Sequence, residues 1–253
     1  MRVISIAGTN GGVGCTTVAA QLAFCLAAQK HRVIAFDFSP QNALRLHFGM
    51  PWDDDTGLVP QTHSGKPWNE AAYCSESGIN FIPFGKTSPQ IKAEFTAKLE
   101  REPGWLSARL QELDEPDGTY VIIDCPQSDS ALSAQAYAAS DLVIVVMEPD
   151  TLSYAAFAAT CAPPAATGKL AVYLINGFDP THPLDREISR VLRATPNNRL
   201  CPVVIHRDEL VREALANKLS LNDYAPYSQT AGDFVSLTTW IIATFAHLRQ
   251  AAS

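Results

Sequence analysis

One stretch near the start of the chain restricts its possible folds more than any other. It reads Ile6-Ala7-Gly8-Thr9-Asn10-Gly11-Gly12-Val13-Gly14-Cys15-Thr16-Thr17, between a short apolar run, Val3–Ala7, and an apolar-periodic run, Val18–Ala28. A strand, a glycine-rich turn and a helix in this order cradle phosphate, because the helix N-terminus offers unpaired N–H groups and a favourable dipole end. Three glycines in four residues make an ordinary tight turn the weaker interpretation, so the stretch predicts a phosphate-binding loop.

The loop departs from the usual P-loop pattern at one position. Thr16 stands where a hydroxyl would ligate Mg²⁺ on a bound nucleotide, but Cys15 occupies the place of the lysine that reaches the phosphates. We expect nucleotide binding here without that lysine's charge. The predicted binding residues of the loop are Asn10, Gly11, Gly12, Val13, Gly14, Cys15, Thr16 and Thr17.

The composition is that of an ordinary globular protein. The 253 residues are 47% hydrophobic and 18% charged, which suits a single α/β domain spanning residues 1–253. A net charge of −7 argues against sequence-independent binding of nucleic acid. The six cysteines show no CxxC spacing, and neither a secretory signal nor an apolar run of membrane-spanning length is visible. We therefore expect a soluble protein of the reducing cytosol.

Strand-like runs alternate with helical ones along the chain. The predicted strands are Arg2–Ala7, Arg32–Phe38, Ile79–Phe84, Tyr120–Asp124, Leu142–Glu148, Leu170–Asn176 and Pro202–Ile205. The predicted helical segments are Cys15–Gln29, Gln41–Phe48, Ala131–Ala139 and Gly232–Gln250, and Ser88–Leu113 is an amphipathic segment. Continuous apolar strands are typical of a parallel sheet buried on both faces, so the pattern predicts an α/β, doubly wound, mostly parallel sheet. The polar, proline-rich segment Pro51–Pro67 is interpreted as a surface excursion.

Two carboxylates follow strands that we expect to end beside the loop. Asp37 closes the second strand, and Asp124 closes the apolar run Tyr120–Asp124 in the manner of a Walker B acid. Ligands of doubly wound sheets gather at the carboxyl ends of strands, and Mg²⁺ uses few protein carboxylates. We predict a metal site of Thr16, Asp37 and Asp124. The alternatives are that Asp37 caps the next helix and that Asp124 is a turn aspartate.

Two later residues are candidates for recognising the base. Asn176 ends the run Leu170–Ile175, and its amide offers both a donor and an acceptor to the edge of adenine. A turn asparagine before Gly177 is the plainer interpretation. Arg207 follows the last strand and could stack on or bond to the base, while Asp208 could cap the helix that begins near Glu209.

Together these residues resemble the MinD/ParA family of deviant Walker ATPases, in the SIMIBI class of P-loop NTPases, over essentially the whole chain. The family pattern is KGGxGKTT, DxDPQ, hhhDxP and a later strand ending in Asn. The corresponding stretches here are Asn10–Thr17, Asp37-Phe-Ser-Pro-Gln41, Ile123-Asp-Cys-Pro126 and Ile175-Asn176. Within the family, the chain is most similar to the BcsQ-type proteins of bacterial cellulose-synthesis operons, above all in Ile205-His-Arg-Asp-Glu209.

Three positions depart from the family pattern. Asn10 replaces the signature lysine that reaches across the dimer, Cys15 replaces the phosphate-loop lysine, and Ser39 replaces the residue that resembles the water-activating aspartate. BcsQ-type proteins are similarly deviant. Because phosphoryl transfer depends on cations that neutralise the transferring oxygens, we expect nucleotide binding with slow or absent hydrolysis.

The resemblance implies ligands and partners. The ligands are ATP and Mg²⁺, and the nucleotide joins two copies face to face in a homodimer. The partners are subunits of the cellulose synthase complex, including small cytosolic proteins of the BcsR and BcsE kind. The protein is then cytoplasmic and is recruited to the inner membrane only through these partners.

Two other functions are open to this fold. A ParA-type DNA-partitioning or cargo-partitioning ATPase needs a basic face, whereas the arginines between 186 and 212 are offset by nearby acids. A MinD-like membrane anchor needs a cationic amphipathic C-terminus. The segment Thr238–Arg249 has an apolar stripe with few cations, which is more typical of a core face.

Overall fold

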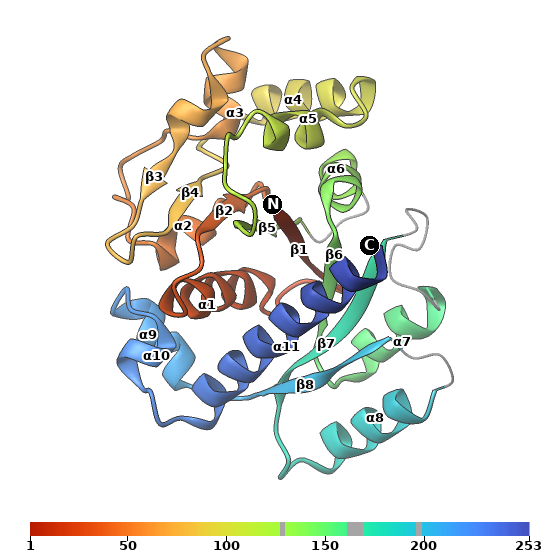
Figure 1. Cartoon of the computed structure of the whole chain (residues 1–253). Helices are drawn as coiled ribbons and strands as arrows, with labels where there is room; N and C mark the ends of the chain where they lie inside the picture. The colour runs from red at the N-terminus through yellow and green to blue at the C-terminus, as the bar shows by residue number, and fades with distance from the viewer. Residues whose placement is uncertain (127–129, 161–168, 196–198, 253) are drawn as a thin grey trace.

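The computed structural model describes residues 1–126, 130–160, 169–195 and 199–252 (Figure 1). Within these residues, eight strands form one sheet in the order β3-β4-β2-β5-β1-β6-β7-β8. The strands are β1 (Arg2–Gly8), β2 (Val33–Asp37), β3 (Tyr73–Cys74), β4 (Asn80–Ile82), β5 (Tyr120–Asp124), β6 (Leu142–Met147), β7 (Leu170–Phe178) and β8 (Leu200–His206). All neighbouring strands are parallel except β3 and β4, which are antiparallel.

Helices connect the strands and cover both faces of the sheet (Figure 1). They are α1 (Cys15–Ala28), α2 (Leu44–His47), α3 (Leu58–His63), α4 (Pro89–Arg101), α5 (Trp105–Gln111), α6 (Ala131–Ala139), α7 (Thr151–Thr160), α8 (Pro183–Ala194), α9 (Leu210–Ala216), α10 (Leu221–Tyr224), α11 (Gln229–Ala252) and a 3₁₀ turn at Trp68–Ala71. Alternate strand residues enter opposite layers: Ile4 and Ile6 pack with α1 and α11, whereas Val3 packs with α4, α5 and α6. Two-sided burial therefore explains the continuous apolar strands.

The predicted α/β fold is confirmed, and each of the seven predicted strands is present. The sequence analysis missed β3, because a two-residue edge strand leaves no periodic pattern. The amphipathic segment Ser88–Leu113 holds two helices, α4 and α5. The two helices are separated by Pro103 and Gly104, and Gly104 has a left-handed φ of 92°.

The segment Pro51–Pro67, interpreted as a surface excursion, is at the surface near both ends but is buried at Gly57–Val59. Leu58 and Val59 begin α3 and are fully buried in the same layer as Phe84 and Trp68. The backbone also packs tightly here, since a Cβ on Gly57 would lie 2.2 Å from the Cα of Gly85. Local polarity concealed this burial, because two apolar residues are too few to reveal a helix face.

The closing helix α11 is a core element. Phe234, Leu237, Ile241 and Phe245 are buried against the α1 layer, and the Phe245 ring lies edge-on to Tyr120 at 5.9 Å. The apolar stripe of the C-terminus thus faces protein, as predicted, although the side chain of Arg249 is outside the described residues. No helix in the described part of the chain is long and apolar enough to cross a membrane.

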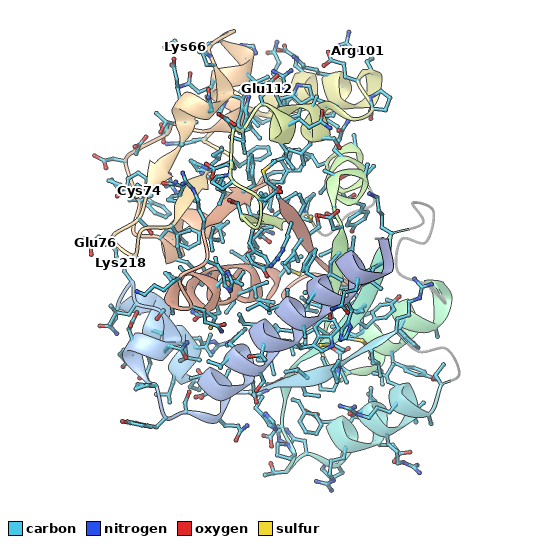
Figure 2. All side chains as sticks on the ribbon, in the orientation of Figure 1. Lys66, Cys74, Glu76, Arg101, Glu112 and Lys218 are labelled. Atoms are coloured by element: carbon cyan, nitrogen blue, oxygen red, sulfur yellow. The ribbon has the colours of Figure 1, made fainter. Side chains whose placement is uncertain are left out.

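The described cysteines are unpaired, in agreement with the absence of a disulfide pattern. Cys15, Cys25, Cys125 and Cys201 are buried, and Cys161 lies outside the described residues. Cys74 is exposed on β3 and is labelled in Figure 2 among outward-pointing charged residues such as Glu76 and Lys218. Burial in apolar layers raises the pKa of the four buried thiols, for Cys201 to about 11, so they act as small hydrophobic side chains.

Candidate nucleotide site

The strand order brings the predicted site residues to one edge of the sheet. β1 lies between β5 and β6, and β5 lies beside β2, so the glycine loop is flanked by the ends of strands that carry carboxylates. Asp37 and Asp124 are direct register partners at the ends of β2 and β5. The carboxyl-end rule for doubly wound sheets therefore holds for these residues.

The loop between β1 and α1 has the backbone that a phosphate cradle needs. Gly12 and Gly14 adopt left-handed φ values of 84° and 91°. Gly14 is restricted twice, because a Cβ there would also lie 2.5 Å from Nδ2 of Asn176. That Nδ2 donates a hydrogen bond of 2.7 Å to the carbonyl of Val13. Asn176 thus anchors the loop through the backbone of Val13. Its contact with adenine stays a prediction.

Thr16 and Asp124 form the centre of the predicted metal site. The Thr16 hydroxyl donates to Oδ2 of Asp124 at 2.6 Å, and Oδ1 of Asp124 is buried without a hydrogen-bond partner. A buried, unpartnered carboxylate oxygen costs free energy that a cation or its water would relieve. These two residues therefore fit Mg²⁺, which is bound in such sites by a hydroxyl and few carboxylates.

Asp37 is engaged with its own turn. Its Oδ1 accepts the N–H of Ser39 at 3.1 Å, and its Oδ2 accepts the N–H of Leu44, the first residue of α2, at 2.9 Å. The alternative that Asp37 caps the next helix therefore describes its contacts, and a role toward metal stays a prediction.

Burial sets the electrostatics of the two acids. Desolvation raises the pKa of Asp124 to about 7. Desolvation and then the charge of Asp124 raise the pKa of Asp37 well above its ordinary range. Two buried carboxylates side by side resist ionisation together, so a divalent cation between them and a phosphate would favour their charged forms.

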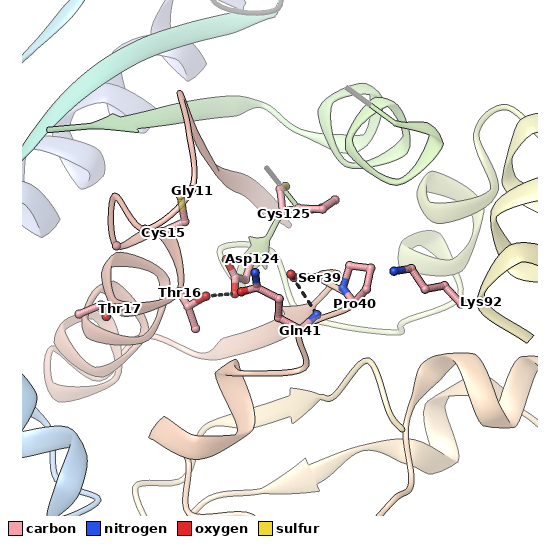
Figure 3. A pocket seen from close by; sticks show the side chains of 13 residues that line it. Gly11, Cys15, Thr16, Thr17, Ser39, Pro40, Gln41, Lys92, Asp124 and Cys125 are labelled. Atoms are coloured by element: carbon pink, nitrogen blue, oxygen red, sulfur yellow. Dashed lines mark hydrogen bonds between the residues drawn. The ribbon is translucent and has the colours of Figure 1, made fainter. Parts of the chain in front are cut away.

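A cavity of about 570 Å³ opens beside the loop (Figure 3). Its lining residues are Gly11, Gly12, Gly14, Cys15, Thr16, Thr17, Ser39, Pro40, Gln41, Lys92, Asp124, Cys125 and Pro126. Six of the predicted loop residues are among them. Asn10 and Val13 are not. Val13 is buried, and the side-chain Oδ1 of Asn10 accepts from the hydroxyls of Thr9 and Ser153, at 2.7 and 3.0 Å.

The replacements of the two lysines leave the loop without a cation of its own. The Cys15 thiol packs under the loop, where a Cβ on Gly8 would lie 2.7 Å from its Sγ. Burial and the Asp124 charge raise the pKa of Cys15 to about 12, so the thiol stays neutral at physiological pH. Ser39, at the position of the expected water-activating aspartate, is buried, and its Oγ faces the N–H of Gln41 at 3.5 Å.

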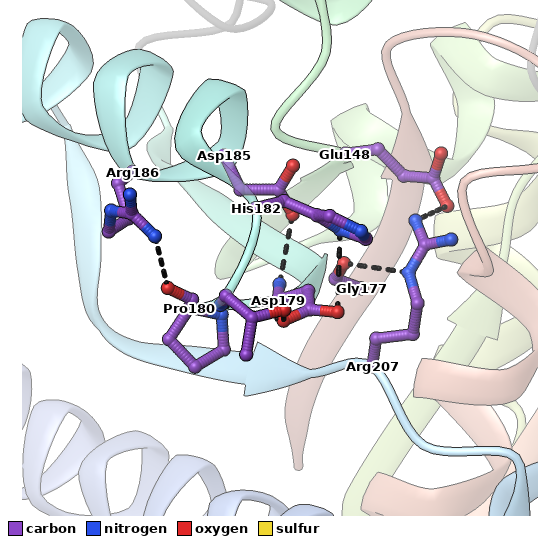
Figure 4. A network of polar contacts seen from close by, with 9 residues as sticks. Glu148, Gly177, Asp179, Pro180, His182, Asp185, Arg186 and Arg207 are labelled. Carbon is purple, nitrogen blue, oxygen red and sulfur yellow. Dashed lines mark hydrogen bonds and ion pairs between the residues drawn. The ribbon is translucent and has the colours of Figure 1, made fainter.

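Arg207 lies apart from the cavity, beyond the end of β8. Its Nε donates to the carbonyl of Gly177 at 3.2 Å, and its Nη2 is 4.0 Å from Oε1 of Glu148 (Figure 4). The side chain is 54% exposed. It stands on the same side of β1 as Asn176, so the predicted base contacts share the β7–β8 side of the loop. Asp208 accepts the N–H of Leu210, as expected of a helix cap.

Sequence reasoning missed one residue of the cavity that carries charge. Lys92 comes from α4, far from any motif, and on sequence alone it is one more lysine of a solvent-facing helix. Only the packing of α4 against the turn after β2 places it at the cavity, so no pattern in the chain announces it.

Comparison with known proteins agrees with this geometry. The family described as "Cellulose biosynthesis protein BcsQ" matches residues 1–242. The chain belongs to the BcsQ family. It is 27% identical to BcsQ of Salmonella typhi over 244 residues, which cover 96% of this chain and 94% of that protein.

Solved structures share the fold. The septum site-determining protein MinD of Pyrococcus horikoshii, complexed with Mg-ADP, superposes with a TM-score of 0.77 at 21% identity over 95% of both chains. A cobyrinic acid a,c-diamide synthase of Mycobacterium smegmatis, with a bound ATP analogue and magnesium, gives a TM-score of 0.70 at 23% identity over 89% of this chain and 93% of that one. This BcsQ-family chain therefore has the MinD/ParA-type P-loop ATPase fold, a fold in which other members hold Mg-nucleotide.

Proposed function

We propose that this chain binds ATP with Mg²⁺ at the glycine loop and uses it as an assembly switch rather than as a source of energy. The observation that carries the proposal is the bond of 2.6 Å between Thr16 and Asp124, with a buried unpartnered oxygen beside it, at the rim of a glycine-lined cavity. Thr16 and Asp124 would hold Mg²⁺, which would neutralise phosphate charge. The backbone amides of Gly11–Gly14 would hold the phosphates themselves.

Slow or absent hydrolysis follows from what stands around the cavity. Rapid phosphoryl transfer needs cations on the transferring oxygens and a group that orients the attacking water. Cys15 is neutral, Asn10 is bonded to Thr9 and Ser153, and the Ser39 hydroxyl is a poor base. Loss of one transition-state cation typically costs a factor of ~10³ or more in rate.

The nucleotide would then join two copies of the chain face to face. The Asn10–Ser153 contact sets the start of α7 beside the loop, and the neighbours of Ser153 carry apolar surface there. Leu152 is 63% exposed and Tyr154 is 36% exposed. Membership of the BcsQ family supports a role for this dimer in assembling the cellulose synthase complex, with membrane recruitment through cytosolic partners of the BcsR and BcsE kind.

The test uses the purified full chain. Calorimetric titration should show binding of ATP and ADP that depends on Mg²⁺, light scattering should show a dimer with Mg²⁺ and a non-hydrolysable ATP analogue, and phosphate release should be slow. Thr16→Ala is the matched control, because it removes the hydroxyl and leaves the loop backbone. Turnover as fast as that of a partner-stimulated MinD would contradict the switch, and absence of nucleotide binding would contradict the whole proposal.

DNA partitioning is the other function that we weighed, and the surface charges argue against it. Arg190 pairs with Glu187 at 2.6 Å, and Arg212 pairs with Glu209 at 3.3 Å. Paired arginines offer little net field to a phosphate backbone. We expect no shift of duplex DNA in a low-salt gel with Mg²⁺ and ATP.

A further inference from the structure

Lys92 lines the phosphate cavity from the side opposite the glycine loop. It is the single lysine or arginine among the described residues that line this cavity. In Figure 3 its ammonium points toward Pro40 and the loop, away from the body of α4. Both lysines of the family pattern are replaced in this loop, by Asn10 and Cys15. Lys92 therefore supplies, from another element, a positive charge that the loop itself lacks.

Aromatic packing fixes α4 beside the turn after β2. Phe95 is buried, and its ring lies 6.5 Å from the ring of Phe38 and 5.4 Å from that of Trp105. Phe38 directly precedes Ser39, whose turn forms one wall of the cavity. Lys92 stands three residues before Phe95 and therefore lies close to it on the same side of α4. Helical side chains lean toward the N-terminus of their helix. The lysine is therefore carried to the cavity by a rigid element.

Neighbouring charges are occupied, and Lys92 is available. Glu94 on the same helix pairs with His63 at 3.3 Å, and Asp55 pairs with Lys86 at 3.4 Å. Arg45 donates to the carbonyls of Trp52 and Asp54. Within the described residues, no carboxylate lies within ion-pair distance of the Lys92 ammonium.

The strand order indicates which phosphate would meet this lysine. The predicted base contacts, Asn176 and Arg207, lie on the β7–β8 side of β1, whereas Ser39 and Lys92 lie on the β2 side. A nucleotide whose base lies toward β7 and whose phosphates follow the loop directs its last phosphate toward β2. Thr16 and Asp124 stand between these two ends.

We propose that Lys92 binds the terminal phosphate of the nucleoside triphosphate and so replaces the lysine missing at position 15. The inference rests on the proposed nucleotide binding and goes beyond it by assigning discrimination between triphosphate and diphosphate to one side chain on α4. The ammonium forms a charge-assisted hydrogen bond that ADP does not offer.

Titration of the purified full chain with a non-hydrolysable ATP analogue and with ADP, each with Mg²⁺, tests the assignment. For Lys92→Ala we expect about tenfold weaker binding of the analogue and an unchanged affinity for ADP. Lys92→Arg should keep most of the analogue's affinity. Lys98→Ala is the matched control, because it removes the same charge from the same helix outside the cavity. Raising the salt concentration should reduce the difference between wild type and Lys92→Ala.

The outcomes separate this inference from the function on which it rests. Unchanged affinity of Lys92→Ala for the analogue would overturn the role of Lys92 and leave nucleotide binding intact. An equal loss for ADP and the analogue would overturn the terminal-phosphate assignment. Failure of the wild-type chain to bind either nucleotide would overturn the proposed function itself, and this inference with it. Thermal unfolding without nucleotide should be the same for wild type and the two Lys92 variants, since Lys92 is exposed.

Discussion

At the scale of single residues, the site is defined by neutral side chains where its fold family carries charge. Cys15 is buried against Gly8 and keeps its proton. The side-chain Oδ1 of Asn10 accepts from the hydroxyls of Thr9 and of Ser153, which lies at the start of α7. A loop of this kind holds an anion by backbone N–H groups and by cations from elsewhere, which in our proposals are Mg²⁺ and Lys92.

Restoring the loop lysine tests this account. Cys15→Lys should bind Mg-ATP about tenfold more tightly than wild type, because a phosphate then gains a charge-assisted hydrogen bond. Cys15→Met is the control, since it lengthens the side chain without charge. Isothermal titration measures both. Equal affinities for Cys15→Lys and wild type would mean that another cation already fills that place, and Lys92 is then the first candidate.

Asp124 should make the stability of the nucleotide-free protein fall as pH rises. Its pKa is raised from 3.8 to about 7 in the folded chain, so between these values the folded state binds more protons than the unfolded state. The stabilisation that Asp124 contributes is therefore fully present below pH ~4 and is lost as the pH rises through ~7. Asp124→Asn should be more stable than wild type at pH 8, by about 2 to 4 kcal/mol, and should no longer bind nucleotide in a Mg²⁺-dependent way.

Urea unfolding of wild type and Asp124→Asn at several pH values measures this effect. The variant should show the flatter dependence between pH 5 and pH ~8, although Asp37 still titrates nearby. Parallel curves for the two proteins would show that Asp124 ionises in the folded chain as it does in the unfolded one.

At the scale of elements, the geometry of the loop is predictable from the local sequence, whereas the position of helix α4 is not. The loop is local: a strand, glycines and a helix N-terminus follow one another within a few residues, and their pattern predicts their geometry. Helix α4 begins at an ordinary cap, Ser88, whose hydroxyl accepts the N–H of Ile91 at 3.3 Å. Its place over the cavity depends on the contacts of Phe95 with Phe38, which is distant in the chain, and with Trp105, at the start of the next helix.

Two glycines of the loop should differ in cost when replaced. Gly12→Ala should destabilise the protein by about 1 kcal/mol, because its φ is left-handed but a Cβ there meets nothing. Gly14→Ala should cost about 2 to 4 kcal/mol and abolish nucleotide binding, because the Cβ also collides with Asn176. Urea denaturation of the pair gives the difference. Equal costs would mean that Asn176 moves aside freely.

At the scale of the whole molecule, one sheet holds both ends of the proposed nucleotide. On one side of β1, the neighbouring strand β5 ends in Asp124. On the other side, beyond β6, strand β7 carries Asn176. The closing helix α11 then seals the α1 layer with Phe234, Leu237, Ile241 and Phe245. The protein therefore has its proposed nucleotide site at one edge of the sheet and keeps the apolar stripe of α11 inside.

The stripe of α11 should behave as core and not as a membrane anchor. Phe245→Ala should cost about 3 to 5 kcal/mol of stability, because the ring is buried against Tyr120. Leu248→Ala, three residues further at 39% exposure, should change the stability by less than ~1 kcal/mol. Neither protein, nor wild type, should co-sediment with anionic lipid vesicles. Vesicle binding that is lost in Leu248→Ala would instead support a lipid-facing helix.

The sequence by itself determined the class of fold, the loop and the acids at the strand ends. These features are local or periodic. The glycines of Gly11–Gly14 predict a turn, and the apolar runs that end in Asp37 and Asp124 predict buried parallel strands. Parallel strands of one sheet necessarily bring their carboxyl ends to one edge, so the meeting of these residues follows from pattern and topology alone.

Tertiary structure alone decided what each side chain does there. It gave both oxygens of Asp37 to backbone N–H groups, turned Asn176 onto the carbonyl of Val13 and buried Leu58 and Val59 in a segment that reads as polar. It also brought Lys92 to the cavity through aromatic contacts between distant segments. Contacts of this kind depend on the packing of whole elements, which no short stretch of sequence encodes.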